Sequence, residues 1–102
     1  IVREEIFGPV LVVQTYTDIE VAIALANDTV YGLPAYVDAG SLEEARGIAD
    51  RLVAGQVVLN GAGPDLTAPF GGVKQSGNGR EYGAYGFEAF LEVKSYIGYG
   101  SA

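Results

Sequence analysis

The sequence contains no cysteine and no histidine, and it also lacks methionine and tryptophan. Without cysteine there is no disulfide framework, no thiolate zinc site and no cysteine nucleophile. Without histidine, the commonest general base and the commonest transition-metal ligand are absent as well. We therefore expect neither a metal site nor a self-contained catalytic centre in these 102 residues.

Positive charge is scarce, because six Lys and Arg residues stand against thirteen Asp and Glu residues, a net charge of −7. Nucleic-acid binding needs a basic patch, and an anionic membrane surface also attracts basic segments. No apolar run approaches the roughly 20 residues of a membrane-spanning helix, and no secretory signal pattern opens the sequence. We expect no nucleic-acid partner, no membrane partner and a cytoplasmic location.

A starting methionine is absent, since the first residue is Ile1. The length is that of one small domain, and 49% hydrophobic residues indicate a globular chain. We expect the sequence to be a piece of a longer protein.

Local patterns in the first part of the chain alternate between strand and helix. The apolar run Val10–Val13 follows a Gly-Pro pair and predicts a buried strand. Thr17 and Glu20 form a capping-box pattern, and apolar residues at helical spacing predict a helix over 18–27. The apolar stretch Leu33–Val37 predicts a second strand, with proline tolerated near its start.

The second part continues the alternation and then changes character. Ser41 and Glu44 form another capping box, which predicts a helix that closes with Gly55 as its C′ residue. The remaining segments are predicted as a strand at 56–60, a Gly-rich loop at 61–79, a helix at 81–93 and an edge strand at 94–99.

The order β-α-β-α-β predicts an α/β fold with a parallel sheet, followed by the Gly-rich loop, a helix and an edge strand. If the strands lie in sequential order, right-handed crossovers place both helices on one face. Val10–Val13 is nevertheless apolar on both sides, as in strands that are covered on both faces. We expect further chain or a partner subunit to cover the other face.

Several residues have the chemistry of a site. Glu4 and Glu5 point to opposite sides of an extended chain, so they form a poor acid–base pair and either acts singly or is solvated. The segment Pro69–Glu81 fits neither the phosphate-binding loop nor the dinucleotide fingerprint. Its cations Lys74 and Arg80 either meet an anion or belong to a structural loop.

Asn60 follows a predicted parallel strand, at the end where ligands bind in open α/β sheets. The long loop after it then overhangs a site. The alternative is an ordinary connection in which Asn60 caps a turn.

Four segments in order resemble signatures of the aldehyde dehydrogenase superfamily. Glu4–Val10 is similar to its E-E-I-F-G-P-V motif, and Asn27–Leu33 to its N-x-x-x-Y-G-L motif. Pro69–Glu81 resembles P-F-G-G-x-K-x-S-G-x-G-R-E, and Glu92–Lys94 matches E-V-K. The resemblance covers essentially the whole chain and implies the C-terminal part of the catalytic domain, at residues 1–93, followed by a terminal oligomerisation strand and tail at 94–102.

The resemblance also implies roles for individual residues. Glu5 matches the glutamate that hydrogen-bonds the ribose beside the nicotinamide of NAD or NADP, and Phe7 matches an aromatic near the nicotinamide ring. Phe70 matches a wall of the substrate tunnel. The loop Gly61–Ala68, with Asn60 before it, matches the segment that shapes the aldehyde pocket, and its lack of aromatics here suggests a roomier or more polar site.

The family mechanism implies residues that this chain does not carry. A cysteine attacks the aldehyde to give a thiohemiacetal, a hydride passes to NAD(P)+, and a glutamate-activated water cleaves the thioester. We expect that cysteine and the general base upstream, an aldehyde as substrate and a homo-oligomer, dimer or tetramer. Two alternatives stay open: a truncated, non-catalytic oligomerisation or binding module, and a CoA-acylating or semialdehyde relative.

Overall fold

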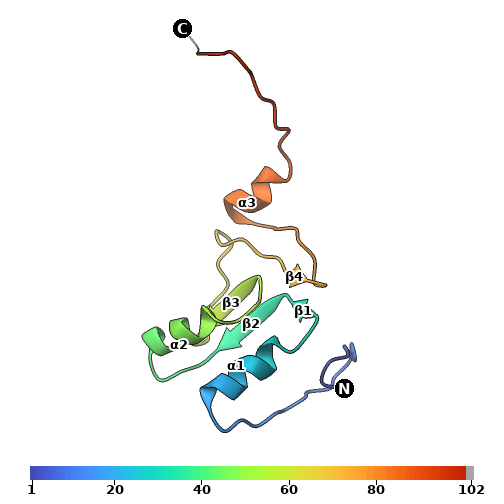
Figure 1. Cartoon of the computed structure of the whole chain (residues 1–102), viewed down its shortest axis with the longest axis vertical. Helices are drawn as coiled ribbons and strands as arrows, with labels where there is room; N and C mark the ends of the chain where they lie inside the picture. Colours follow the sequence, from blue (N-terminus) through green and yellow to red (C-terminus); the bar gives the residue numbers. More distant parts are fainter. Residues whose placement is uncertain (101–102) are drawn as a thin grey trace.

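The computed structural model describes residues 1–100. Within them lie three short helices and four short strands, drawn in Figure 1. Their bounds are α1 Ile19–Asn27, β1 Tyr31–Gly32, β2 Pro34–Val37, α2 Leu42–Ala49, β3 Gln56–Leu59, β4 Val73–Lys74 and α3 Gly83–Glu88.

The first helix forms where the apolar spacing predicts it, but its N-cap is Asp18 and not Thr17. Asp18 has extended backbone angles, φ −148° and ψ 167°, and its Oδ1 accepts a hydrogen bond from the N–H of Val21 at 3.0 Å. A carboxylate interacts more favourably than a hydroxyl with the positive N-terminal end of a helix, which explains the shift by one residue.

The unit β2-α2-β3 is the predicted parallel strand–helix–strand crossover. The two strands pair in parallel from Pro34 opposite Gln56 to Val37 opposite Leu59, and α2 packs on both. Ser41 caps α2 as predicted, since its Oγ accepts a hydrogen bond from the N–H of Glu44 at 3.1 Å. Pro34 occupies the first position of its strand, where no ladder hydrogen bond is lost.

The role predicted for Gly55 is wrong, because α2 ends at Ala49. Gly55 instead donates its N–H to the carbonyls of Gly32 and Leu33, at 3.1 and 3.2 Å. A Cβ at position 55 would lie 1.7 Å from the carbonyl oxygen of Gly71, so the backbones approach more closely than any side chain allows. Glycine is needed here for this contact and not to end the helix.

The Gly-rich segment 61–79 contains structure that the sequence did not predict. Within it, β4 pairs antiparallel with β1, with Tyr31 opposite Lys74 and Gly32 opposite Val73. Phe70 and Glu81 form a further antiparallel bridge, with N···O distances of 2.7 and 2.6 Å. The fold therefore has two separate two-stranded sheets among residues 1–100, where the sequence predicted three parallel strands.

Within the described residues, two predicted strands are wrong and one predicted helix is shorter than predicted. Val10–Val13 and 94–99 form no strand, and the helix predicted over 81–93 is reduced to the six residues of α3. These segments lie open to solvent: Leu11, Phe90 and Ile97 are 86%, 87% and 99% exposed. A strand or a long helix needs a surface to pair or pack against, and residues 1–100 supply none at these places.

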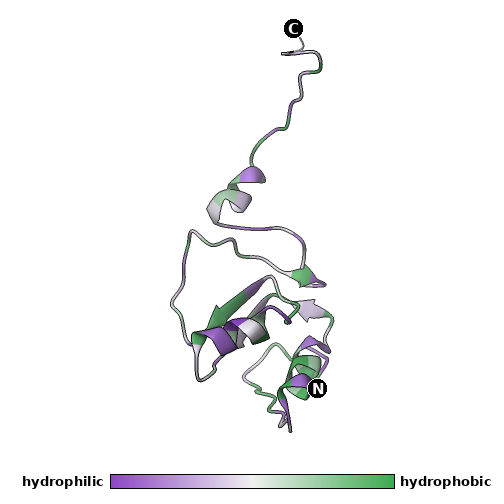
Figure 2. Ribbon diagram, turned by 60° about the vertical axis from the view of Figure 1, so that its left-hand side comes forward, coloured by the Kyte–Doolittle hydropathy of each residue, from purple (hydrophilic) through white to green (hydrophobic). Residues whose placement is uncertain are grey.

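The buried core is small. Ile23 of α1, Val37 of β2 and Ala45 of α2 are its buried hydrophobic residues. The radius of gyration is 18.3 Å, against about 13 Å for a compact domain of this length. Figure 2 shows hydrophobic residues also along the C-terminal segment that projects from the body. The described chain therefore leaves much apolar surface for other protein to cover.

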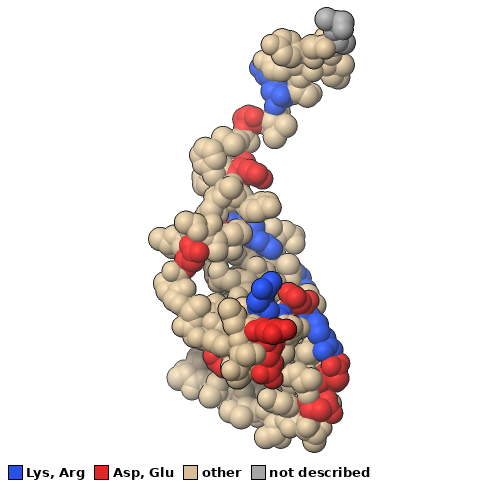
Figure 3. All heavy atoms as spheres, turned by 90° about the vertical axis from the view of Figure 1, so that its left-hand side faces the viewer, with Lys and Arg blue, Asp and Glu red and all other residues tan. Residues whose placement is uncertain are grey.

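The structure shows how charge is distributed on the surface and whether any helix is long enough to span a membrane. On the face shown in Figure 3, basic side chains lie among acidic ones and do not form a patch of one sign. Of the helices between residues 1 and 100, none has the length and apolar character needed to cross a bilayer.

Candidate functional site

Glu5 lines a cavity with a volume of about 480 Å³. The N-terminal residues 2–5 form one side of this cavity, and the opposite side comes from β1, from residues 52–54 and from Ser76. The Glu5 side chain is exposed and accepts no hydrogen bond from within the described chain. Its carboxylate is therefore free to accept hydrogen bonds from a hydroxyl-bearing ligand.

Phe7 stands outside this cavity and is 93% exposed. Its backbone has φ 53°, the left-handed conformation that is uncommon for a bulky residue. Such strained residues cluster at ligand-binding positions, where the surroundings hold them. Within the described chain the Phe7 side chain is almost fully exposed, and Phe7 does not line the cavity that Glu5 lines.

Asn60 and Gly61 form a tight turn after β3. Both have positive φ, 47° and 66°, and the N–H of Ala62 donates to the carbonyl of Leu59 at 3.0 Å, as in a type I′ turn. The Oδ1 of Asn60 accepts a hydrogen bond from the N–H of Ala39 at 2.9 Å. The Asn60 side chain is thus engaged in holding the ends of β2 and β3 together, which favours its turn-capping role.

The loop after this turn presents a fixed carboxylate. Oδ1 of Asp65 accepts from the N–H of Thr67 at 2.8 Å and from its hydroxyl at 2.6 Å. The hydroxyl hydrogen bond, followed by the backbone one, lowers the pKa of Asp65 below its usual value. Asp65 therefore carries its negative charge into the acidic range, on the rim of a cavity of about 560 Å³ beside β3.

Phe70 is half-buried and lines a separate cavity of about 330 Å³, together with the two glycines that follow it and the segment 79–81. Its backbone is fixed by the bridge to Glu81. This cavity and the cavity of Glu5 have Leu33 and Ser76 in common as wall residues. Glu5 and Phe70 therefore line two cavities that share wall residues, while Asn60 and Gly61 line neither cavity.

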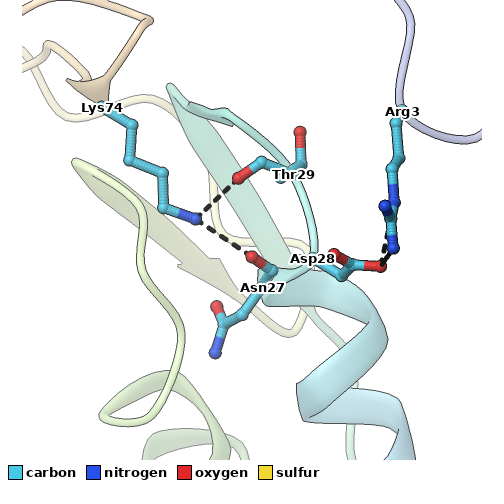
Figure 4. A network of polar contacts seen from close by, with 5 residues as sticks. All are labelled: Arg3, Asn27, Asp28, Thr29 and Lys74. Atoms are coloured by element: carbon cyan, nitrogen blue, oxygen red, sulfur yellow. Dashed lines mark hydrogen bonds and ion pairs between the residues drawn. The ribbon is translucent and has the colours of Figure 1, made fainter.

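The two cations of the glycine-rich segment bind backbone carbonyls and no anion site. Lys74 Nζ donates to the carbonyl oxygens of Asn27 and Thr29, at 3.0 and 2.9 Å (Figure 4). Arg80 donates to the carbonyls of Gly72 and Gly79, at 2.7 and 2.9 Å. Of the two interpretations of this segment, an anion site or a structural loop, these contacts support the structural loop.

Sequence reasoning missed the part played by Asn27. Its Nδ2 donates to the carbonyl of Arg51 at 2.9 Å, and its Oδ1 accepts from the N–H of Val53 at 2.8 Å. Nearby, the Oγ of Ser76 accepts from the N–H of Gly32 at 3.0 Å. The family motifs contain Asn27 and Ser76, but the hydrogen-bond partners of both residues are distant in sequence. The one local signal for such a role was the position of Asn27 at the end of a predicted helix.

The described residues offer little to a metal ion and only part of what a dinucleotide cofactor needs. Between residues 1 and 100, no three acidic side chains gather into a group that could hold a metal ion. The cavity of Glu5 is lined by two carboxylates, Glu4 and Glu5, which suit a ribose diol, but its cation Arg3 is already paired with Asp28. The cavity therefore suits a ribose of a dinucleotide, but its described lining residues offer no unpaired cation for the phosphates.

Comparison with known proteins identifies the family. The model of the aldehyde dehydrogenase family matches residues 1–96. A 3-succinoylsemialdehyde-pyridine dehydrogenase from a Pseudomonas species is 63% identical over 99 residues, which are 97% of this chain and 21% of that protein. The chain therefore belongs to the aldehyde dehydrogenase family, and it spans about a fifth of the length of the curated relatives it matches.

Solved structures agree with this assignment. A variant of aldehyde dehydrogenase C from Pseudomonas syringae, crystallised with NAD+ and octanal, matches with a TM-score of 0.93 and 57% identity, over 98% of this chain and 21% of that one. A succinic semialdehyde dehydrogenase from Streptococcus pyogenes in complex with NADP+ matches at 0.83 and 36%, over 89% and 20%. The α/β character of the chain is thus that of this family.

Proposed function

We propose that this chain forms part of an NAD(P)+-dependent aldehyde dehydrogenase that oxidises an aldehyde to a carboxylic acid. The observation that carries the proposal is the family match over residues 1–96, which includes the segments of Glu5 and Phe70. The chain has no cysteine, so the nucleophile that forms the thiohemiacetal and thioester comes from another part of the enzyme. On its own, the 102-residue chain is inactive.

Glu5 is the cofactor contact that this chain supplies. A carboxylate that is free of internal partners accepts hydrogen bonds from two neighbouring ribose hydroxyls, and such charge-assisted bonds orient a ligand strongly. NAD(P)+, when bound, supplies the acceptor for the hydride that leaves the substrate carbon. Phe7 packs beside the nicotinamide ring once other parts of the enzyme cover its exposed face.

Phe70 forms a wall of the aldehyde site. Phe70 is half-buried and its backbone is fixed by the bridge to Glu81, so its side chain offers an apolar surface to the substrate chain. Asn60 and Gly61 act by setting the course of the loop 61–68, whose small and polar residues leave space for a larger aldehyde.

Residues 94–99 serve oligomerisation. They form no strand within the described chain and are exposed, with Ile97 99% and Tyr96 75% open to solvent, so these apolar side chains are available to a partner surface. We place the boundary between the catalytic part and this terminal segment after Val93. The partner is a second copy of the same enzyme, because most soluble oligomers are symmetric homo-oligomers.

The proposal is tested with the purified enzyme that contains this chain, by following NADH and NADPH formation with aldehydes from acetaldehyde to octanal. We expect aldehyde-dependent reduction of the cofactor without coenzyme A, and higher kcat/KM for long aldehydes than for acetaldehyde. Turnover that requires coenzyme A points to the acylating relative. The absence of any aldehyde-dependent reduction contradicts the proposed function.

A further inference from the structure

The turn that ends α1, residues 27–29, binds two cations that are distant from each other in sequence. Lys74 reaches it from β4 and donates to the carbonyls of Asn27 and Thr29, at 3.0 and 2.9 Å. Arg3 reaches it from the N-terminal segment, and its Nη2 lies 2.6 Å from Oδ2 of Asp28. Figure 4 shows the two cations on either side of this turn.

Electrostatics explain why cations gather at this turn. The last carbonyls of a helix are unsatisfied and carry partial negative charge, which a nearby cation stabilises. No basic residue lies in the last turn of α1, and its C-cap, Asp28, adds a full negative charge. The positive charge that this helix end needs is supplied by Arg3 and Lys74, which are distant in sequence.

Each of these cations is attached to a segment with a proposed role in binding. Arg3 lies two residues before Glu5, and both residues line the same cavity as Asn27 and Thr29. Lys74 belongs to the loop 70–81, which the bridge between Phe70 and Glu81 closes.

The position of Lys74 is defined by its backbone as well as by its side chain. Its φ is 55°, in the left-handed region, and the next residue, Gln75, donates its N–H to the carbonyl of Val30 at 2.9 Å. Lys74 and Gln75 are thus both hydrogen-bonded to the segment 27–30.

We propose that the 27–29 turn fixes the distance between the cofactor contact Glu5 and the substrate wall Phe70, with Arg3 and Lys74 as the positioning residues on its two sides. This inference rests on the proposed function for the roles of Glu5 and Phe70. The coupling itself rests on the contacts of the turn.

Because these contacts are exposed, a role in positioning the binding segments and a role in stabilising the fold predict different results. The side chains of Arg3 and Asp28 are 72% and 52% exposed, and exposed ion pairs contribute little to folding. Loss of either cation therefore leaves the thermal midpoint almost unchanged, whereas it loosens one binding segment relative to the other. A role in stability alone predicts the opposite pattern.

The test uses Arg3→Met, Lys74→Met and the double variant of the enzyme that contains this chain, assayed with NAD+ and its best aldehyde between acetaldehyde and octanal. We expect KM for NAD+ to rise about fivefold in Arg3→Met and KM for the aldehyde about fivefold in Lys74→Met, with kcat changed less than about twofold. The effects in the double variant are not additive, because one turn carries both.

Arg46→Met, on the exposed surface of α2, is the matched control for the loss of a cation. Lys74→Arg keeps donors for both carbonyls and restores the aldehyde KM. If Lys74→Met does not fold, Lys74→Gln replaces it with the same expectation. Changes no larger than those in Arg46→Met, or additive effects in the double variant, overturn the inference.

Hydrogen exchange gives a readout that does not depend on activity. In Lys74→Met we expect faster exchange not only in the peptide 70–81 but also in the peptide 1–8, which carries Glu5. Faster exchange confined to 70–81 overturns the coupling. An enzyme that oxidises no aldehyde and still shows the joint change contradicts the proposed function and supports the positioning of the two segments.

Discussion

Gly55 and Gly71 approach so closely that a Cβ on residue 55 would lie 1.7 Å from the carbonyl oxygen of Gly71. Because that neighbour is backbone, it cannot rotate away as a side chain does. The contact brings the start of β3 against the segment that follows Phe70. Gly55, just before β3, and Gly71, just after Phe70, are therefore in direct backbone contact.

Replacement of Gly55 by alanine is expected to destabilise the enzyme by about 3 kcal/mol, since backbone must move to admit the methyl group. Gly47 is the matched control, because it lies inside α2 and a Cβ there meets nothing within 4 Å. Gly47→Ala is expected to stabilise by about 0.5–1 kcal/mol, from helix propensity. Denaturant unfolding of both variants gives the comparison, and equal changes would contradict the close contact.

Substitutions at Asn60 separate its two possible roles. Asn60→Ala removes the acceptor for the N–H of Ala39 and places alanine in the left-handed region, which together cost about 2 kcal/mol of stability. Asn60→Asp keeps an acceptor oxygen and a residue tolerant of this conformation, so it is expected to keep the thermal midpoint and the aldehyde KM. A raised aldehyde KM in a fully stable Asn60→Asp variant would instead show contact with the substrate.

Local signals were enough to predict the central part of the fold. The capping residue Ser41 and the apolar spacing of 18–27 predicted α1 and α2, because a helix and its cap lie within a few residues of sequence. The parallel pair β2–β3 followed from the alternation of strand and helix. These predictions depended on neighbours in sequence and were confirmed.

The sheet β1–β4 could not be predicted in the same way. Its strands have two residues each, and the nearby hydrogen bond between Gly32 and Ser76 joins positions 44 apart in sequence. A Gly-rich composition hides such a pairing, since strand propensity is low there. Val10–Val13 and 94–99 have strong strand patterns and yet form none, because strand formation depends on a partner that residues 1–100 do not provide.

Some residues of the site were predicted from the sequence, but their contacts were not, because those contacts depend on the tertiary structure. Lys74 and Arg80 were recognised as noteworthy, but only the structure shows that they bind carbonyls. The pairing of Asn27 with Arg51 and Val53 depends on tertiary packing. The roles of Glu5 and Phe7 come from family resemblance, and they remain predictions.

The ion pair between Glu20 and Arg51 is expected to make stability depend on pH. The guanidinium of Arg51 donates to both carboxylate oxygens of Glu20, and this hydrogen bonding lowers the pKa of Glu20 below its ordinary 4.5. The unfolded chain thus binds the proton more readily than the folded one. The stabilisation is complete above pH 4.5 and is lost as the pH falls through the lowered pKa of the folded state.

Glu20→Gln tests this dependence, with Glu43→Gln on the exposed surface of α2 as control. The thermal midpoint of Glu20→Gln should lie slightly below that of the unmodified enzyme at neutral pH, and the two should converge in acid. A difference that grows as the pH falls would contradict the assigned sign. The effect is small, because both side chains are exposed.

The assignment of Glu5 as the cofactor contact is tested most directly by the KM for NAD+ and NADP+ in Glu5→Gln, with Glu43→Gln as control, in the enzyme that contains this chain. Loss of a charge-assisted bond to the ribose is expected to raise the cofactor KM by about tenfold or more, with the thermal midpoint unchanged, because the Glu5 carboxylate has no internal partner. A cofactor KM within about twofold of the unmodified value would contradict the account.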